Sequence, residues 1–358
     1  MDENLQYIAE TELSTAVRES GSRSGIAIVM RPHTGEILAM ASFPTFNPNR
    51  FDEAPETHRR NRSVTDVYEP GSTFKIVAAA AALEEGVTTE DERIDCGQGA
   101  IRIADRTIRD HRPFDVLTFR EVVTRSSNIG MIRIGQRLGK TRLEAYVKAF
   151  GFGEATGVEL PAESRGILSP AERWGASTSA SIAFGQEVSV TPLQMVAAAN
   201  AIATSGSLMR PRLVLGFSGS DGALVPALSP EPVRRVVSEA TARRLSDILV
   251  EAVEKGTGKN AAIPGDKVAG KTGTAQKAVP GGYSRTDFIA SFVGFAPAGR
   301  PRLVISVILD EPKGLEWGGY NAAPVFRNIA RHALTRLGVP PDRPAEMVRR
   351  PAGRPGKT

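Results

Sequence analysis

The sequence contains little cysteine and little histidine. Cys96 is the only cysteine among 358 residues, so no disulfide can form within the chain and no metal cluster can be built from thiolates. The four histidines, His33, His58, His111 and His332, do not have the spacing typical of a metal site. We therefore expect no metal ion in this protein.

A long apolar run is also missing. No stretch approaches the roughly 18 apolar residues of a membrane-spanning helix, and the first residues do not resemble a signal peptide. These absences leave two alternatives, a cytosolic protein or a soluble part of a longer protein.

The chain has no strong excess of charge outside its C-terminal end. Net charge is +5 and the pI is about 9.4, and the excess is concentrated in a stretch rich in proline and glycine. Its basic residues are Arg336, Arg343, Arg349, Arg350, Arg354 and Lys357. We predict a disordered basic tail over residues 339–358, which favours a solvated segment over one that binds an anionic surface. We expect no nucleic-acid partner.

Hydrophobic patterning predicts strands at both ends of the chain and helices between them. An amphipathic helix is expected over 4–19 and a closing helix over 325–337. Other helices are expected over 70–86, 117–125, 129–138, 143–150, 191–203 and 239–255, with a short β excursion at 94–110 and a loop at 152–190. Strands are expected over 25–30, 36–41, 267–276, 287–295 and 303–310.

These elements indicate an α+β fold with one five-stranded, mainly antiparallel sheet built from both chain ends. The terminal helices would cover one face of the sheet and the helical block the other, with a cleft between block and sheet edge. We predict a single domain over 1–338. Its sheet subdomain would comprise 1–66 and 238–338, and its mostly helical subdomain 67–237.

The helix that begins near Ser72 carries the first group of chemical interest. Ser72 and Lys75 are three residues apart and so share one face of the helix. The rest of the helix is small and apolar, which predicts burial. A buried lysine with a lowered pKa could activate the serine hydroxyl as a nucleophile. The alternative is a capping serine beside a surface lysine.

A second polar group, Ser126-Ser127-Asn128, lies between two expected helices. A hydroxyl at Ser126 and a carboxamide at Asn128 could relay a proton and hydrogen-bond a peptide carbonyl. The alternative is a turn that only caps a helix.

The third group, Lys271-Thr272-Gly273-Thr274, lies inside an expected strand. Glycine in a strand interior often marks close approach of a ligand to the backbone. Lys271 supplies positive charge for a carboxylate, and Thr272 and Thr274 supply hydroxyls. An edge strand could also pair with a bound peptide through Gly273 and its neighbours. The alternative is a twisted strand with a surface lysine.

The three groups in this order resemble the signature of penicillin-recognising serine acyltransferases. The sequence is similar, over about 4–337, to the transpeptidase domain of class B penicillin-binding proteins, above all to the septal, division-specific type often called penicillin-binding protein 3. The similarity includes 68–75, 184–186, 190–194 and 270–276. Asn128, in place of aspartate, favours the septal over the elongation type. The segment 316–320 departs from the family, which more usually has an aromatic pair before Gly-Gly.

The resemblance implies a fold and a set of catalytic roles. The fold would be the one shared by penicillin-binding proteins and serine β-lactamases. Ser72 would attack the penultimate D-Ala carbonyl of a stem peptide, Lys75 would act as its base and Ser126 would join the proton relay. An amine from a second stem would then resolve the acyl-enzyme into a cross-link, without a metal or an organic cofactor.

The resemblance also implies a binding surface. Asn128 would hold the donor peptide, while Lys271, Thr272 and Thr274, on the strand that includes Gly273, would hold the terminal carboxylate of the peptide or of a β-lactam. The backbone N–H groups of Ser72 and Thr274 would form the oxyanion hole.

Family members carry an N-terminal membrane helix and a non-catalytic domain before this region. We therefore expect this chain to be the catalytic part of a longer parent protein at the periplasmic face of the inner membrane. The expected partners are peptidoglycan stem peptides and β-lactams, and for the parent protein a membrane glycosyltransferase and other division proteins.

Two other functions share part of this signature. A serine β-lactamase has a similar serine motif, but the Ser-x-Val and Tyr-Gly-Asn of class D enzymes and the Glu-x-x-Leu-Asn of class A enzymes are not found in the matching places. A non-catalytic β-lactam sensor would bind the drug covalently without turnover. A pure interaction module would have no use for three aligned polar groups.

Overall fold

A five-stranded antiparallel sheet forms the centre of the computed structural model, which describes residues 1–104, 106–218, 220, 224–226, 230 and 232–342. The strand order is β11-β12-β13-β1-β2, and the bounds are β1 (Ser24–Met30), β2 (Ile37–Phe43), β11 (Ala269–Val279), β12 (Gly282–Ala296) and β13 (Leu303–Asp310). The early and late strands meet where β1 pairs with β13. The α+β fold and the sheet built from both chain ends are thus confirmed.

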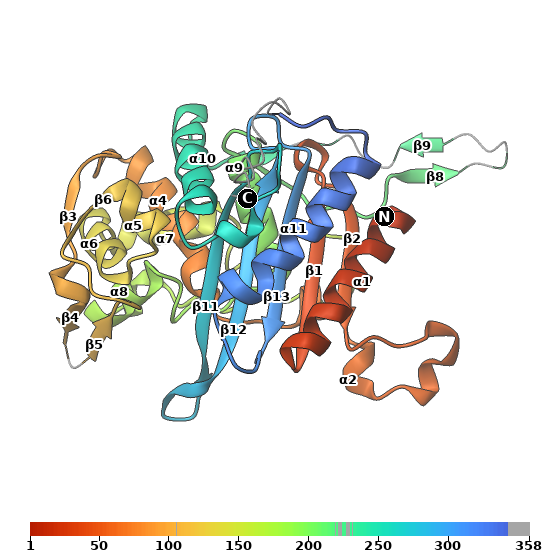
Figure 1. Cartoon of the computed structure of the whole chain (residues 1–358), viewed down its shortest axis with the longest axis horizontal. Coiled ribbons are helices and arrows are strands. Elements are labelled where there is room, and N and C mark those ends of the chain that lie inside the picture. The colour runs from red at the N-terminus through yellow and green to blue at the C-terminus, as the bar shows by residue number, and fades with distance from the viewer. Residues whose placement is uncertain (105, 219, 221–223, 227–229, 231, 343–358) are drawn as a thin grey trace, which may run out of the picture.

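Two terminal helices cover one face of this sheet. Figure 1 shows α1 (Glu3–Ser20) and α11 (Gly318–Arg336) side by side across the strands. In α1 the buried side chains are Leu5, Ala9, Leu13 and Val17, which recur every four residues and so form one apolar stripe. Asp2 caps the start of the helix, and Gly21 ends it with a left-handed backbone. The apolar spacing and the two caps thus both account for the helix that was predicted over 4–19.

The other face of the sheet packs against helices from the middle of the chain. All seven residues of β1 are buried, because both faces of the strand are covered. Two buried helices, α4 (Lys75–Glu84) and α9 (Pro192–Ala203), belong to the large core on this side. Around them lie α5 (Phe119–Thr124), α6 (Asn128–Leu138), α7 (Lys140–Ala149), α8 (Ala176–Ile182) and α10 (Glu239–Glu254). The helices α4 to α8 extend beyond edge strand β11 (Figure 1).

Short elements complete the described chain. The small strands are β3 (Arg93–Asp95), β4 (Ala100–Ile103), β5 (Arg106–Arg109), β6 (Val116–Thr118), β7 (Ser207–Met209), β8 (Gly216–Ser218), β9 (Leu224–Pro226) and β10 (Pro232–Arg235). The short helices include α2 (Glu56–Arg59), α3 (Arg62–Thr65), and the 3-10 helices η3 (Gly71–Phe74) and η6 (Lys259–Ala261). Within the described ranges, no helix has the length and apolarity needed to cross a membrane.

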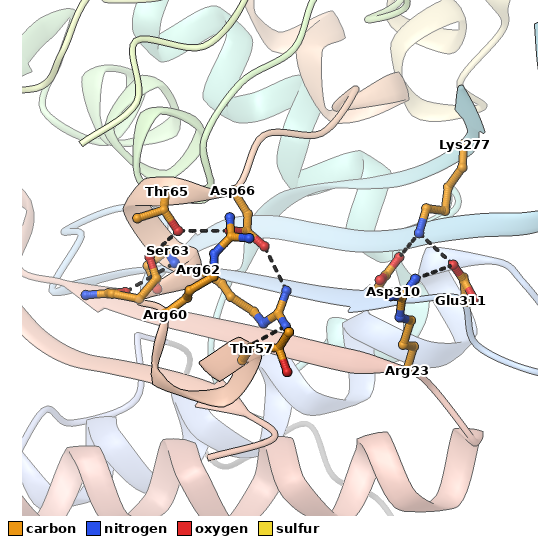
Figure 2. A network of polar contacts seen from close by, with 11 residues as sticks. Arg23, Thr57, Arg60, Arg62, Ser63, Thr65, Asp66, Lys277, Asp310 and Glu311 are labelled. Carbon is orange, nitrogen blue, oxygen red and sulfur yellow. Dashed lines mark hydrogen bonds and ion pairs between the residues drawn. The ribbon is translucent and has the colours of Figure 1, made fainter. Parts of the chain in front are cut away.

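Ion pairs fix the segment that leads to η3 and the far end of the sheet (Figure 2). Arg60 and Arg62 both contact the carboxylate of Asp66, at 2.5 and 2.8 Å. At the end of β11, the Lys277 ammonium bonds Asp310 at 2.9 Å and Glu311 at 2.6 Å, while Arg23 lies 3.5 Å from Glu311. Lys277 thereby reaches from β11 to the end of β13, past the intervening strand.

Several elements differ from the prediction, and the largest differences concern helices. Helix α8 lies within 152–190, which was predicted to be loop, and α11 begins at Gly318, not at residue 325. The helix predicted over 70–86 consists of η3 followed by α4. The helix predicted over 191–203 is confirmed, with Thr191 in a capping box and Pro192 in its first turn.

The predicted basic tail falls mostly outside the described residues, at 343–358. Arg336 belongs to α11 and not to a tail. Val339 packs partly buried against the apolar cluster under α1 and α11, and the Asp342 carboxylate accepts the Lys267 N–H at 2.9 Å. The subdomain boundaries at 66/67 and 237/238 stay a prediction.

Candidate active site

Ser72 lies in the tight turn of η3, at the wall of a cavity of about 590 Å³. Gly71 has a left-handed φ of 53°, and its N–H donates to Gly185 O at 2.9 Å. The Thr73 hydroxyl closes the turn by donating to Pro70 O at 2.8 Å. Within the described chain, the half-buried Ser72 side chain forms no hydrogen bond. The turn therefore presents a hydroxyl that is free to react.

Lys75 begins α4 one turn further on and is fully buried. Its ammonium donates to Ser126 O at 2.7 Å, Asn128 Oδ1 at 2.8 Å and Ser126 Oγ at 3.2 Å. Burial lowers the pKa of Lys75 to about 7, although the negative charge of Asp110 acts in the opposite direction. The structure thus places Lys75 in direct contact with Ser126 and Asn128 of the second polar group. Lys75 also follows Ser72 by one turn of the same continuous helical segment.

Ser126 lies in a constrained loop between α5 and α6. Its φ of 61° is left-handed, which is unusual for a residue with a side chain. Its buried hydroxyl accepts a hydrogen bond from Lys271 Nζ at 2.9 Å. The neighbouring Ser127 is the N-cap of α6, since its hydroxyl accepts the Gly130 N–H at 2.9 Å. The alternative of a turn that caps a helix therefore describes Ser127, and leaves Ser126 and Asn128 facing the site.

Strand β11 divides the third polar group between two faces. Lys271 is fully buried and also donates to Thr272 O at 3.1 Å; burial and the charge of Lys75 lower its pKa well below the usual range. Gly273 has no room for a side chain, because a Cβ there would lie 2.3 Å from Ser291 Oγ. Thr272 and Thr274 instead line the cavity. The group thus separates the buried Lys271 side chain from two hydroxyls on the cavity wall, of which Thr272 is buried and Thr274 half-buried.

Each of the two threonine hydroxyls forms a hydrogen bond with a neighbouring residue, which orients it. Thr274 Oγ1 accepts the Gly318 N–H at 3.0 Å, and Thr272 Oγ1 lies 2.6 Å from Thr257 Oγ1. An oxygen that already accepts a hydrogen bond turns its own proton elsewhere. The Thr274 hydroxyl is therefore a ready donor to a carboxylate in the cavity.

Asp110, which the sequence motifs do not predict, organises the second polar group from a segment outside it. Its carboxylate accepts the N–H groups of Asn128 and Ile129, the latter at 3.2 Å, and the Ser127 hydroxyl at 2.7 Å. A carboxylate at a helix start satisfies free N–H groups and the helix dipole. No local motif surrounds Asp110, so only the folded chain reveals its role.

A second missed group supports the nucleophile turn from the other side. Glu69 Oε1 accepts the Glu187 N–H at 3.1 Å and the Tyr283 hydroxyl at 3.2 Å, and burial raises the pKa of Glu69. The Glu187 carboxylate pairs with Arg106 at 2.6 Å. These contacts hold the segment that carries Gln186, a cavity residue, against the loop before Ser72. Glu69 lies within the motif 68–75, but no local pattern in the sequence indicates this role.

Aromatic side chains form the opposite rim of the cavity. Trp317 and Tyr320 line it and remain 40% and 62% exposed. The His111 ring lies 5.9 Å from that of Trp317, so the helical block and the start of α11 meet across the cavity. Burial and the positive charge of Arg112 lower the pKa of His111. The segment 316–320, which differs from the usual family pattern, therefore forms part of the cavity wall.

The site unites all three polar groups of the sequence. Ser72, Ser126, Asn128, Thr272 and Thr274 line one cavity, and Lys75 and Lys271 lie buried behind it. In the parts of the chain described above, no three His, Cys, Asp or Glu side chains are arranged to hold a metal ion.

The family described as penicillin binding protein transpeptidase domain matches residues 25–331, and the chain belongs to this family. More particularly, it resembles the proteins of that family named penicillin-binding protein 3. It is similar to the apo transpeptidase domain of Burkholderia pseudomallei penicillin-binding protein 3, with a TM-score of 0.85, 35% identity and coverage of 96% of this chain and 97% of that chain. The fold expected from the resemblance is thereby confirmed.

A second structure and a curated relative extend this comparison. Penicillin-binding protein 3 from Mycobacterium tuberculosis, solved with aztreonam, matches with a TM-score of 0.89 and 36% identity, over 96% of this chain and 79% of that chain. Stage V sporulation protein D of Bacillus subtilis is 42% identical over 346 residues, which cover 95% of this chain and 54% of the relative. The chain thus spans about half the length of the curated relatives it matches.

Proposed function

We propose that this chain is the catalytic domain of a serine-type D,D-transpeptidase, which cross-links peptidoglycan stem peptides and is acylated by β-lactams. One observation carries the proposal. Lys75 Nζ and Lys271 Nζ lie 3.2 and 2.9 Å from Ser126 Oγ, behind a cavity wall formed by the turn of Ser72. This arrangement links a nucleophile, a base of lowered pKa and a proton relay.

Acylation would begin when Ser72 Oγ attacks the penultimate D-Ala carbonyl of the donor stem. Its proton would pass to the uncharged amine of Lys75, whose pKa of about 7 permits this form at neutral pH. The Ser126 hydroxyl, in contact with both lysines, would deliver a proton to the departing amine of the terminal D-Ala. The N–H groups of Ser72 and Thr274 would hold the developing oxyanion.

Binding would orient the donor before the chemistry starts. The terminal carboxylate would lie against the hydroxyls of Thr272 and Thr274. Buried Lys271 would carry the positive charge when Lys75 is uncharged, because the two lysines repel each other only when both are protonated. The carboxamide of Asn128 would donate to a donor carbonyl from one N–H of Nδ2, because its Oδ1 already accepts Lys75 and its other N–H donates to Arg109 O at 3.1 Å. An amine from a second stem would then attack the acyl carbonyl and release Ser72.

The parent protein would act in septal wall synthesis at the periplasmic face of the inner membrane. The similarity to peptidoglycan D,D-transpeptidase FtsI of Escherichia coli, 35% identical over 346 residues, supports the proposed reaction, and the similarity to structures named penicillin-binding protein 3 supports the septal type. A membrane glycosyltransferase and other division proteins are its proposed partners.

Hydrolysis of β-lactams is the main alternative, and the cavity disfavours it. Two acidic residues, Asp110 and Glu316, line the cavity. The Asp110 carboxylate already accepts three hydrogen bonds, so it is a poor base for a deacylating water. Glu316 is the other carboxylate on the wall, and we propose that it does not activate water either, so that the acyl-enzyme persists until an amine reaches it. A non-catalytic sensor would instead form the adduct and never transfer the acyl group.

A thioester analogue of the donor dipeptide, offered together with a D-amino acid, tests the proposal. The expected product is the new peptide bond to the D-amino acid, formed by wild type and not by Ser72→Ala. Rapid hydrolysis of both thioester and penicillin would indicate a β-lactamase. A stable penicillin adduct without any acyl transfer would indicate a sensor.

A further inference from the structure

A second cavity adjoins the catalytic one. It measures about 450 Å³, and its wall includes His111, Arg112, Arg125, Lys255, Thr257 and Lys259. His111, Thr257 and Lys259 line both cavities, so the two spaces share a wall. Ser72 lines only the first. The second cavity is therefore a side space of the catalytic groove and not part of the acylation site.

The wall of this second cavity carries unbalanced positive charge. Arg125 is paired with Glu121 at 2.6 Å, but Arg112, Lys255 and Lys259 have no carboxylate partner in the described part of the chain. The Arg112 guanidinium lies 5.0 Å from the centre of the Phe114 ring, a contact that limits its movement. A concave surface lined by cations of one sign concentrates anionic groups.

The second cavity lies next to the part of the catalytic groove that Thr272 lines. Thr257, which lines both spaces, has its hydroxyl 2.6 Å from that of Thr272. In the proposed reaction, Thr272 holds the carboxylate of the departing D-Ala. The second cavity therefore adjoins the end of the groove at which the leaving group would be held.

Reaction chemistry determines what must approach from this end. The acceptor amine attacks the same carbonyl carbon from which the D-Ala amine departed, the bond from that carbon to Ser72 Oγ breaks, and the amine proton returns to the serine oxygen through the lysine relay. By microscopic reversibility, the attacking amine occupies the position that the leaving amine held. The rest of the acceptor chain must then extend past Thr272.

We propose that the second cavity binds a carboxylate of the acceptor stem peptide, with Arg112 and Lys255 as its main cations. The proposal rests on the proposed transpeptidase function and adds a place for the second substrate. It makes the acceptor, and not the donor, sensitive to these two charges. An acidic segment of a partner protein is the competing occupant, and the test separates the two.

The test uses the acyl-enzyme from the thioester donor and two acceptor peptides with the same amine, one ending in a free carboxylate and one in an amide. In wild type we expect faster acyl transfer to the carboxylate acceptor. In the double variant Arg112→Ala/Lys255→Ala, transfer to that acceptor should fall about 10-fold, the effect of losing charge-assisted contacts, while transfer to the amide stays unchanged. The matched control, Lys140→Ala/Arg300→Ala, removes one exposed lysine and one exposed arginine outside both cavity walls and should behave as wild type.

A binding measurement tests the same proposal if acyl transfer is too slow to be followed. The penicillin-acylated protein is titrated with the two acceptor peptides, each carrying a fluorophore. Tighter binding of the carboxylate peptide to wild type, lost in the double variant and weakened by salt, supports the proposal. Equal binding of both peptides to wild type, or no effect of the double variant, overturns it and favours a partner protein as the occupant. Labelling of the variants by penicillin at the wild-type rate shows that the catalytic site is intact, whereas failure of wild type to be labelled counts against the proposed function itself.

Discussion

Lys75 and Lys271 share one hydrogen-bond acceptor, with their Nζ atoms 3.2 and 2.9 Å from Ser126 Oγ. Ser126 lies 51 residues from Lys75 and 145 from Lys271 in sequence, so only the folded chain brings them together. Both lysines are fully buried, and burial together with mutual repulsion disfavours two charged ammonium groups. The pair thus provides an amine that loses its proton near neutral pH.

The rate of acylation should depend on the protonation of Lys75. Its pKa of about 7 means that the amine is charged, and unable to accept a proton, at lower pH. We expect the rate of labelling by penicillin to rise with pH through about 7, and Lys75→Ala to be slower by about 10²–10⁴-fold. Lys75→Arg is the control that keeps the charge but cannot lose its proton. A pH-independent rate in wild type, or a near-normal rate in Lys75→Ala, would move the role of base elsewhere.

Asp110 should tune this pH dependence. Its negative charge favours the charged form of Lys75, so Asp110→Asn should lower the pKa of Lys75 further and move the midpoint of the rate profile to lower pH. Asparagine keeps one oxygen acceptor for the helix N–H groups. Asp115→Asn, an exposed change a few residues away, is the control. A uniform loss of rate without a shift would mean that Asp110 acts only on the position of the loop.

The contact between Gly185 and Gly71 should be essential for the shape of the nucleophile turn. Gly185 has a φ of 86°, and a Cβ there would lie 2.1 Å from Gly71 O. We expect Gly185→Ala to cost about 1–3 kcal/mol of unfolding free energy and to slow acylation strongly. Gly86→Ala is the control, because Gly86 also has a positive φ, 63°, but no atoms within 4 Å of the added Cβ. Equal behaviour of the two variants in thermal unfolding and penicillin labelling would contradict this role.

Lys271 should take part both in the proton relay through Ser126 and in binding the carboxylate of the substrate. Its Nζ donates a hydrogen bond to Ser126 Oγ. The Lys271 side chain lies behind the cavity wall to which Thr272 and Thr274 belong, so it would act on a bound carboxylate through its charge. We expect Lys271→Ala to slow acylation and to weaken binding of a carboxylate-bearing β-lactam more than that of its methyl ester. Competition against labelled penicillin measures both affinities. An unchanged preference for the carboxylate would restrict Lys271 to the relay.

Local patterns predicted most of the fold, and the exceptions have physical causes. Helix α8, Ala176–Ile182, consists mainly of small and polar residues and has no apolar period. The start of α11 contains two glycines and includes Pro324, all weak helix formers. Gly318 is required there because a Cβ would lie 2.2 Å from Gly273 O. The start of α11 therefore depends on close packing against strand β11, which the local sequence pattern does not indicate.

The site was predictable to the extent that its residues form short motifs. Ser72, Asn128 and Thr274 belong to segments whose spacing carries the resemblance, and the structure places all three at one cavity. Asp110 and Glu69 were not predictable, because their functions depend on hydrogen bonds to residues far along the chain. A carboxylate that caps a helix from another segment leaves no local pattern.

The most direct measurement is the mass of the protein after reaction with penicillin, followed by peptide mapping. The expected result is one stable adduct on the peptide that contains Ser72, and no adduct on Ser72→Ala. An adduct on another residue, an equal adduct on Ser72→Ala, or rapid release of hydrolysed drug would contradict it.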